Sequence, residues 1–143
     1  MAITIFRIGK IREPYIQEAE KHYLKMLPTI TSITLKGSDS AVEDSKILVK
    51  KLVGIKNVHI LAEKGKLLNS YTFANHMQSA LLGLDDITLV IAGPFGWDYQ
   101  LLPKSWQLLS LSPLTFPHEL AYVLLLEQLF RATKIVKGQK YHY

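Results

Sequence analysis

The chain has 143 residues, 48% apolar and 20% charged, a composition typical of globular rather than disordered proteins, and its length predicts one domain over residues 1–143. The absence of cysteine excludes disulfides and thiolate metal sites. A net charge of +5 favours a polyanionic partner, because basic surface releases counterions from phosphates. No apolar run is long enough for a membrane-spanning helix or a signal peptide, so we expect a cytoplasmic protein.

Short apolar runs alternate with helical patterns along the first two thirds of the chain. Pro14 suits the first turn of a helix, and Ser40 and Glu43 have the spacing of a capping box. Four lysines near the second helix are expected on its solvated face, with a nucleic-acid role as the alternative. The predicted strands are 2–8, 33–35, 58–61 and 87–92, and the predicted helices are 14–27, the one following Ser40, and 70–82.

The last third predicts a short strand at Leu108 and Leu109, a loop over 110–115, and a long helix over 120–136. Thr115 is a suitable capping residue, and Pro117 fits the first helical turn. The apolar surface of this helix is too broad for one sheet face, which indicates a second partner.

Strands that alternate with helices predict an α/β protein with a parallel sheet that binds ligands at the carboxyl ends of its strands. Those ends are 61–63, 92–96 and 111–116. The sequence has no GxGxxG or GxSxG motif, and its five histidines have no metal-binding spacing, so we expect no bound metal.

Several motifs occur in a meaningful order: VIAGPFG, LSLSPLTFPHEL, LLLEQLFRA, KIVKG and a terminal Tyr-His pair. Together they resemble the bacterial large-subunit ribosomal RNA methyltransferase H family, which are pseudouridine N3-methyltransferases of the SPOUT class. The resemblance implies a homodimeric SPOUT methyltransferase fold with a C-terminal trefoil knot. It also implies S-adenosylmethionine as cofactor and N3 of a pseudouridine in 23S ribosomal RNA, within the assembled ribosome, as the methyl acceptor.

The same resemblance assigns cofactor contacts to three segments. They are Leu61, then Ala92 and Gly93, then Leu111, Ser112, Pro113, Leu114, Thr115 and Phe116. Apolar walls around irregular turns suit an adenosine, because exposed backbone groups can hydrogen-bond its edge.

The C-terminal tail is basic, and no acid follows Glu127. Aromatic residues and a histidine among cations suit unstacked RNA bases, although a frayed, solvated terminus is the alternative. We expect this tail near a cofactor cleft. The candidates are Arg131, Lys134, Lys137 and Lys140 for RNA binding, and His142 and Tyr141 for catalysis.

Three residues leave alternatives open. His118 can act as a base, or it can hydrogen-bond a neighbouring loop or the dimer partner. Arg131 can form a structural ion pair with Glu127, four residues earlier, instead of binding phosphate. Tyr122 stands where relatives usually carry arginine, which keeps a non-catalytic RNA-binding homodimer, or a structural homodimer with an empty cleft, as competing interpretations.

Overall fold

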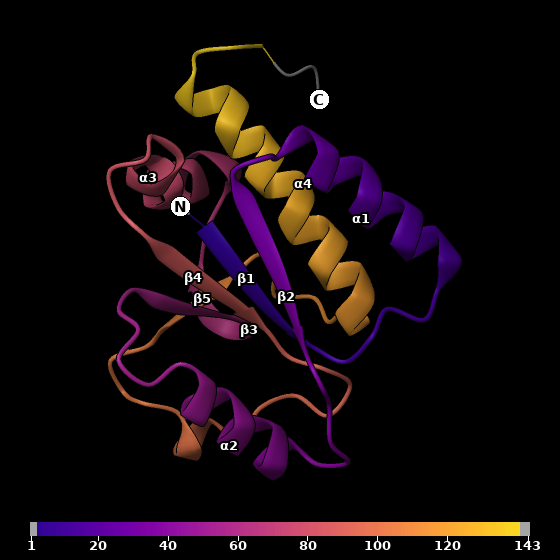
Figure 1. Cartoon of the computed structure of the whole chain (residues 1–143). Coiled ribbons are helices and arrows are strands. Elements are labelled where there is room, and N and C mark those ends of the chain that lie inside the picture. The colour runs from indigo at the N-terminus through magenta and orange to yellow at the C-terminus, as the bar shows by residue number, and fades with distance from the viewer. Residues whose placement is uncertain (1–2, 141–143) are drawn as a thin grey trace.

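The computed structural model describes residues 3–140, in which five parallel strands form one sheet with helices on both faces (Figure 1). The strand order is β2-β1-β4-β3-β5, and every neighbouring pair is parallel. The elements are β1 (Ile3–Ile8), α1 (Pro14–Met26), β2 (Ile30–Leu35), α2 (Ala41–Lys51), β3 (Val58–Leu67), α3 (Ser70–Leu81), β4 (Ile87–Ile91), the short 3-10 helix η1 (Tyr99–Leu101), β5 (Gln107–Ser110) and α4 (His118–Val136).

The sheet separates two apolar cores. One core lies between the sheet and α1, α3 and α4, and it includes Leu89, Leu125 and Leu129. The other lies under α2 and includes Leu48 and Trp97. All five residues of the central strand β4 are buried, as expected for a parallel strand covered on both faces.

Two helix starts are built by the capping patterns in the sequence. Ser40 accepts a hydrogen bond from the Glu43 backbone N–H at 3.1 Å, as its spacing predicts. Asn69 caps α3 and exchanges hydrogen bonds with Thr72 at 2.9 Å in each direction. The prediction of Thr115 as the cap of α4 was wrong: the helix begins at His118, and the Thr115 hydroxyl donates to Glu63.

Strand β3 is longer than the apolar run that predicts it. It pairs with β5 at Leu61, bulges, and pairs again from Lys66. A Cβ on Gly65 would lie 2.6 Å from the Leu108 carbonyl carbon, so the close approach of the two backbones requires glycine there. Because the 63–66 segment is polar, the apolar pattern of the sequence did not predict this second pairing.

The sheet order brings the carboxyl ends of β3, β4 and β5 together, and α4 begins at the same edge. Glu119 fixes that start, because its carboxylate accepts backbone N–H groups of Arg12 at 2.9 Å and Glu13 at 3.2 Å, just after β1. Helix α4 has 19 residues and therefore runs about 28 Å away from this edge.

Candidate active site

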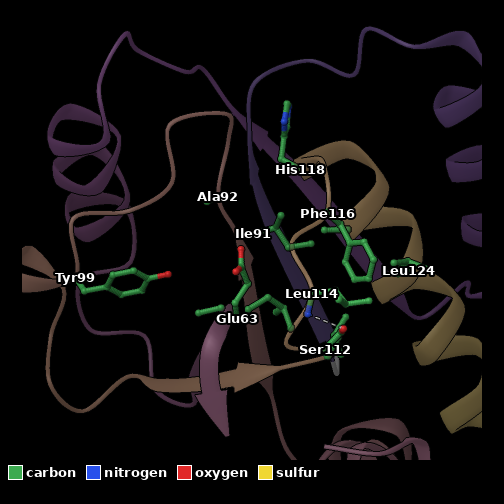
Figure 2. Close-up of a pocket in the computed structure, with 13 residues that line it drawn as sticks. Glu63, Ile91, Ala92, Tyr99, Ser112, Leu114, Phe116, His118 and Leu124 are labelled. Carbon is green, nitrogen blue, oxygen red and sulfur yellow. Dashed lines mark hydrogen bonds between the residues drawn. The ribbon is translucent and has the colours of Figure 1, made fainter. Parts of the chain in front are cut away.

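A pocket lies at the carboxyl edge of the sheet, where β3, β4, the loop after β5 and the first turns of α4 meet (Figure 2). The pocket is open to solvent, and its empty space, counting the open mouth, is about 690 Å³. The lining residues are Leu61, Ala62, Glu63, Ile91, Ala92, Tyr99, Leu111, Ser112, Leu114, Phe116, His118, Ala121 and Leu124.

One wall of the pocket is apolar and comes from the 111–116 loop and α4. The Ser112 hydroxyl accepts the Leu114 backbone N–H at 3.0 Å, which shapes the loop locally. Leu114 lines the pocket and is 67% exposed. With Phe116 and Leu124 beside it, the wall suits a flat apolar ring system (Figure 2).

The opposite wall is polar. The Thr115 hydroxyl donates to Glu63 Oε2 at 2.9 Å, which ties the 111–116 loop to the bulged part of β3. Burial, and then the negative charge of Glu63, raise the pKa of Tyr99, so its hydroxyl stays protonated and can donate. Figure 2 shows this hydroxyl pointing toward Glu63. The Lys64 ammonium lies 3.8 Å from the centroid of the Tyr99 ring and covers one face of it.

His118 lines the pocket from the first turn of α4. Its Nε2 lies 3.9 Å from Glu119 Oε2, the carboxylate that holds the loop after β1. The sequence allowed two roles for His118, a base or a hydrogen bond to a loop. The structure is compatible with both, because His118 lines the pocket and lies near the Glu119 carboxylate.

Six of the nine residues expected to bind cofactor line this pocket: Leu61, Ala92, Leu111, Ser112, Leu114 and Phe116. Gly93 does not, because it packs against β1, where an added Cβ would lie 2.9 Å from Ile8 Cγ2. Pro113 and Thr115 are exposed and also lie outside the lining.

Sequence reasoning missed several lining residues as cofactor contacts. Ala121 and Leu124 follow His118 at helical spacing, a signal that was available. Tyr99 comes from an irregular connection and carried no signal. Glu63 stands in a strand end that was recognised as a ligand position, but no role was given to it.

Comparison with known proteins identifies the family. A family model described as "Predicted SPOUT methyltransferase" matches residues 1–142. The chain belongs to this family. The expected resemblance is thereby confirmed.

Curated relatives agree with this assignment. A "Ribosomal RNA large subunit methyltransferase H" from Pseudothermotoga lettingae is 44% identical over the full length of both chains. Proteins of the same name from Kosmotoga olearia and Prochlorococcus marinus are 37% and 41% identical, the first over the full length of both chains. The second comparison covers 96% of this chain and 93% of the relative.

In this family member, the basic residues of the C-terminal segment lie far along α4 from the pocket. The Arg131 guanidinium contacts Glu127 Oε1 at 3.0 Å, the ion pair that the spacing predicts. The Lys134 ammonium donates to Gln139 Oε1 at 3.1 Å, and Lys137 ends the helix. Lys140 follows it. None of these residues lines the pocket, and the catalytic candidates Tyr141 and His142 lie outside the described residues.

Tyr122 also faces away from the pocket. It is fully buried, and its hydroxyl donates to Glu20 Oε2 at 2.5 Å and lies 2.8 Å from Ser32 Oγ. The Arg7 guanidinium carbon lies 4.6 Å from the centroid of its ring. Burial, and then the hydrogen bond to Glu20, raise the pKa of Tyr122 far above its usual value. Its role here is therefore to hold α1, β2 and α4 together.

Two classes of site receive no support from residues 3–140. Within that range, no three His, Asp or Glu side chains gather to hold a metal ion. Nor does any helix of this range combine the length and apolarity that crossing a bilayer requires.

Proposed function

We propose that this chain is a cytoplasmic homodimeric enzyme that transfers a methyl group from S-adenosylmethionine to N3 of a pseudouridine in large-subunit ribosomal RNA. The pocket at the carboxyl ends of β3, β4 and β5 is the observation that carries the proposal, because the 111–116 loop lines it in a chain of the SPOUT methyltransferase family. The names of the relatives supply the class of substrate.

The residues of the pocket fit this cofactor. Leu114, Phe116 and Leu124 offer an apolar surface for adenine, and the backbone of the 111–116 loop offers hydrogen bonds to its edge. Bound there, S-adenosylmethionine supplies a methyl carbon activated by the positive charge on sulfur. Glu63 and Tyr99 supply polar groups for the remainder of the molecule.

The reaction requires a base, because N3 of pseudouridine carries a proton. Methylation of N3 would release this proton, which would pass to a side chain of the enzyme or to the ribosomal environment. His142 and Tyr141 remain our candidates for this task, with His118 at the pocket rim next in line. The rest of the rate enhancement comes from alignment of N3 with the methyl carbon.

The length of α4 supports a dimer whose active sites are shared. A tail that begins about 28 Å from its own pocket reaches an active site most simply in a second copy of the chain. On α4, Leu120 is 38% exposed, and Leu67 at the end of β3 and Tyr71 in the first turn of α3 are 61% and 70% exposed. Contact between two copies through this region would bury these side chains.

We also propose the trefoil knot that the family resemblance implies. The 93–106 connection and the 111–117 connection both border the pocket, through Tyr99 and Phe116, as two crossing segments of a C-terminal knot would. Pulling the unfolded chain by its two ends tests the proposal. A knotted chain reaches a shorter full extension than 143 free residues allow, whereas the full contour length would contradict the knot.

Calorimetric titration of S-adenosylmethionine, followed by methylation of ribosomes that lack the modification, tests the function. Binding, together with mass-spectrometric detection of N3-methylpseudouridine, is the expected result. Absence of cofactor binding would contradict the proposal, and salt-sensitive ribosome binding in its place would favour the non-catalytic RNA-binding homodimer.

A further inference from the structure

Glu63 combines features that the proposed function has not yet used. Among the described residues that line the pocket, it is the one acidic side chain, and no lysine or arginine lines the pocket with it. Its carboxylate points into the space between Tyr99 and Leu114 (Figure 2). A carboxylate in a small-molecule site of a basic protein calls for a ligand that it can bind.

One of the two oxygens of the Glu63 carboxylate accepts a hydrogen bond from the protein. Oε2 accepts the Thr115 hydroxyl at 2.9 Å, and within residues 3–140 no side chain bonds to Oε1 or forms an ion pair with Glu63. The adjacent Lys64 is committed elsewhere, since its ammonium lies over the Tyr99 ring. The hydrogen bond to Oε2 therefore holds the carboxylate in position, and Oε1 can accept a hydrogen bond from a ligand in the pocket.

The division of the pocket into two walls indicates which part of a ligand meets Glu63. Leu114, Phe116 and Leu124 form the wall that suits an adenine, so the amino-acid end of a bound S-adenosylmethionine extends toward the polar wall. That end carries an ammonium group, and a charge-assisted hydrogen bond to a carboxylate is stronger than a bond between neutral groups.

We propose that Glu63 is the residue that selects the ammonium group of the cofactor's methionine portion, with Oε1 as the acceptor and Thr115 as the residue that orients it. The inference rests on the proposed function, because it assigns a partner within the same pocket. The carboxylate then contributes to binding of the cofactor and of its demethylated product alike, since both carry this ammonium.

Calorimetry with three ligands tests the proposal on Glu63→Gln, which keeps the size of the side chain and its bond to Thr115 but removes the charge. S-adenosylmethionine and S-adenosylhomocysteine both carry the ammonium, whereas 5′-methylthioadenosine retains the adenosine and lacks the amino-acid end. We expect the first two to bind about 10- to 100-fold more weakly, with 5′-methylthioadenosine within about twofold of wild type.

Two further variants separate charge from structure. Glu18→Gln removes an exposed charge from α1 and should leave all three affinities unchanged. Thr115→Val keeps the charge of Glu63 but removes its orienting bond, so it should weaken the two ammonium-bearing ligands by less than Glu63→Gln does. Thermal unfolding of each variant verifies that the fold is intact.

Each other outcome contradicts the assignment in a distinct way. Unchanged affinities would leave Glu63 as a structural tie to Thr115 alone. Equal weakening of all three ligands would place the ribose hydroxyls at the carboxylate, and weakening of S-adenosylmethionine alone would place the sulfonium there. A wild-type protein that binds none of the three would overturn both this inference and the proposed function, which distinguishes the two failures.

Discussion

The two ends of α4 differ in what surrounds them. Its first turns line a pocket with His118, Ala121 and Leu124, next to strand ends from the same chain. Its last turn carries Lys134 and is followed by Lys137, about 28 Å from the first turn, and neither lysine lines the pocket. One chain lines this pocket by itself, and our proposal of a shared active site would bring the tail of a second chain to it.

The largest expected effect comes from the pocket end. Leu114→Asp should weaken S-adenosylmethionine binding by about 1,000-fold or more, because an unpaired carboxylate would be desolvated against the adenine. Calorimetry measures the loss. Leu84→Asp, at a leucine 78% exposed and outside the pocket, is the matched control and should bind normally. Equal affinities for the two variants would place the cofactor elsewhere.

The tail should show the opposite behaviour. Deletion of residues 139–143 should leave cofactor affinity within about twofold, while methyl transfer to ribosomes falls by about 100-fold or more, the usual range for loss of an acid or base. His142→Ala alone should lower turnover and change its dependence on pH. Normal turnover by the truncated enzyme would instead make the tail a solvated terminus and direct attention to His118.

Variants of Tyr122, in the first half of α4, test whether this residue affects cofactor binding or only the stability of the fold. Tyr122→Phe removes the donor to Glu20 and should lower the free energy of unfolding by about 1–3 kcal/mol without changing cofactor affinity. Tyr122→Arg should destabilise more, because it buries a second guanidinium beside Arg7. Chemical denaturation gives both values, and a weakened cofactor with an unchanged stability would refute a purely structural role.

The smallest effect is expected from the lysines after α4. Lys137→Gln with Lys140→Gln should reduce the salt dependence of ribosome binding by about one phosphate contact per lysine. The matched control replaces Lys50 and Lys51 at the end of α2, whose place on the solvated face predicts no change. If the control pair changes the salt slope and the tail pair does not, the RNA lies on the α2 side.

Regular elements and strand ends were predictable from local pattern, whereas contacts set by irregular segments were not. The apolar run of β4 and the cap at Ser40 each carry their structure in adjacent residues. Tyr99 reaches the pocket from a connection without periodicity, and Thr115 gives its hydroxyl to Glu63, 52 positions away, instead of capping α4. Such distant partners leave no trace in local spacing.

The direction of α4 was available in principle. A helix that follows a parallel strand runs back along the sheet, so the last turn of a 19-residue helix lies far from the strand end where the helix began. This distance is the reason for our proposal that the tail reaches the cleft of another copy. That consequence depends on length and topology and not on any motif.

Mixed dimers test most directly the proposal that the tail of one chain acts at the pocket of the other. Leu114→Asp and the 139–143 deletion are each expected to be inactive alone, and co-expression at equal levels pairs them in about half of all dimers. If the tail acts on the partner's pocket, each mixed dimer keeps one complete site, and ribosome methylation should recover to about one quarter of wild type. If the tail acts on its own pocket, every site in the mixture is defective, so activity at the level of the separate variants would contradict the account.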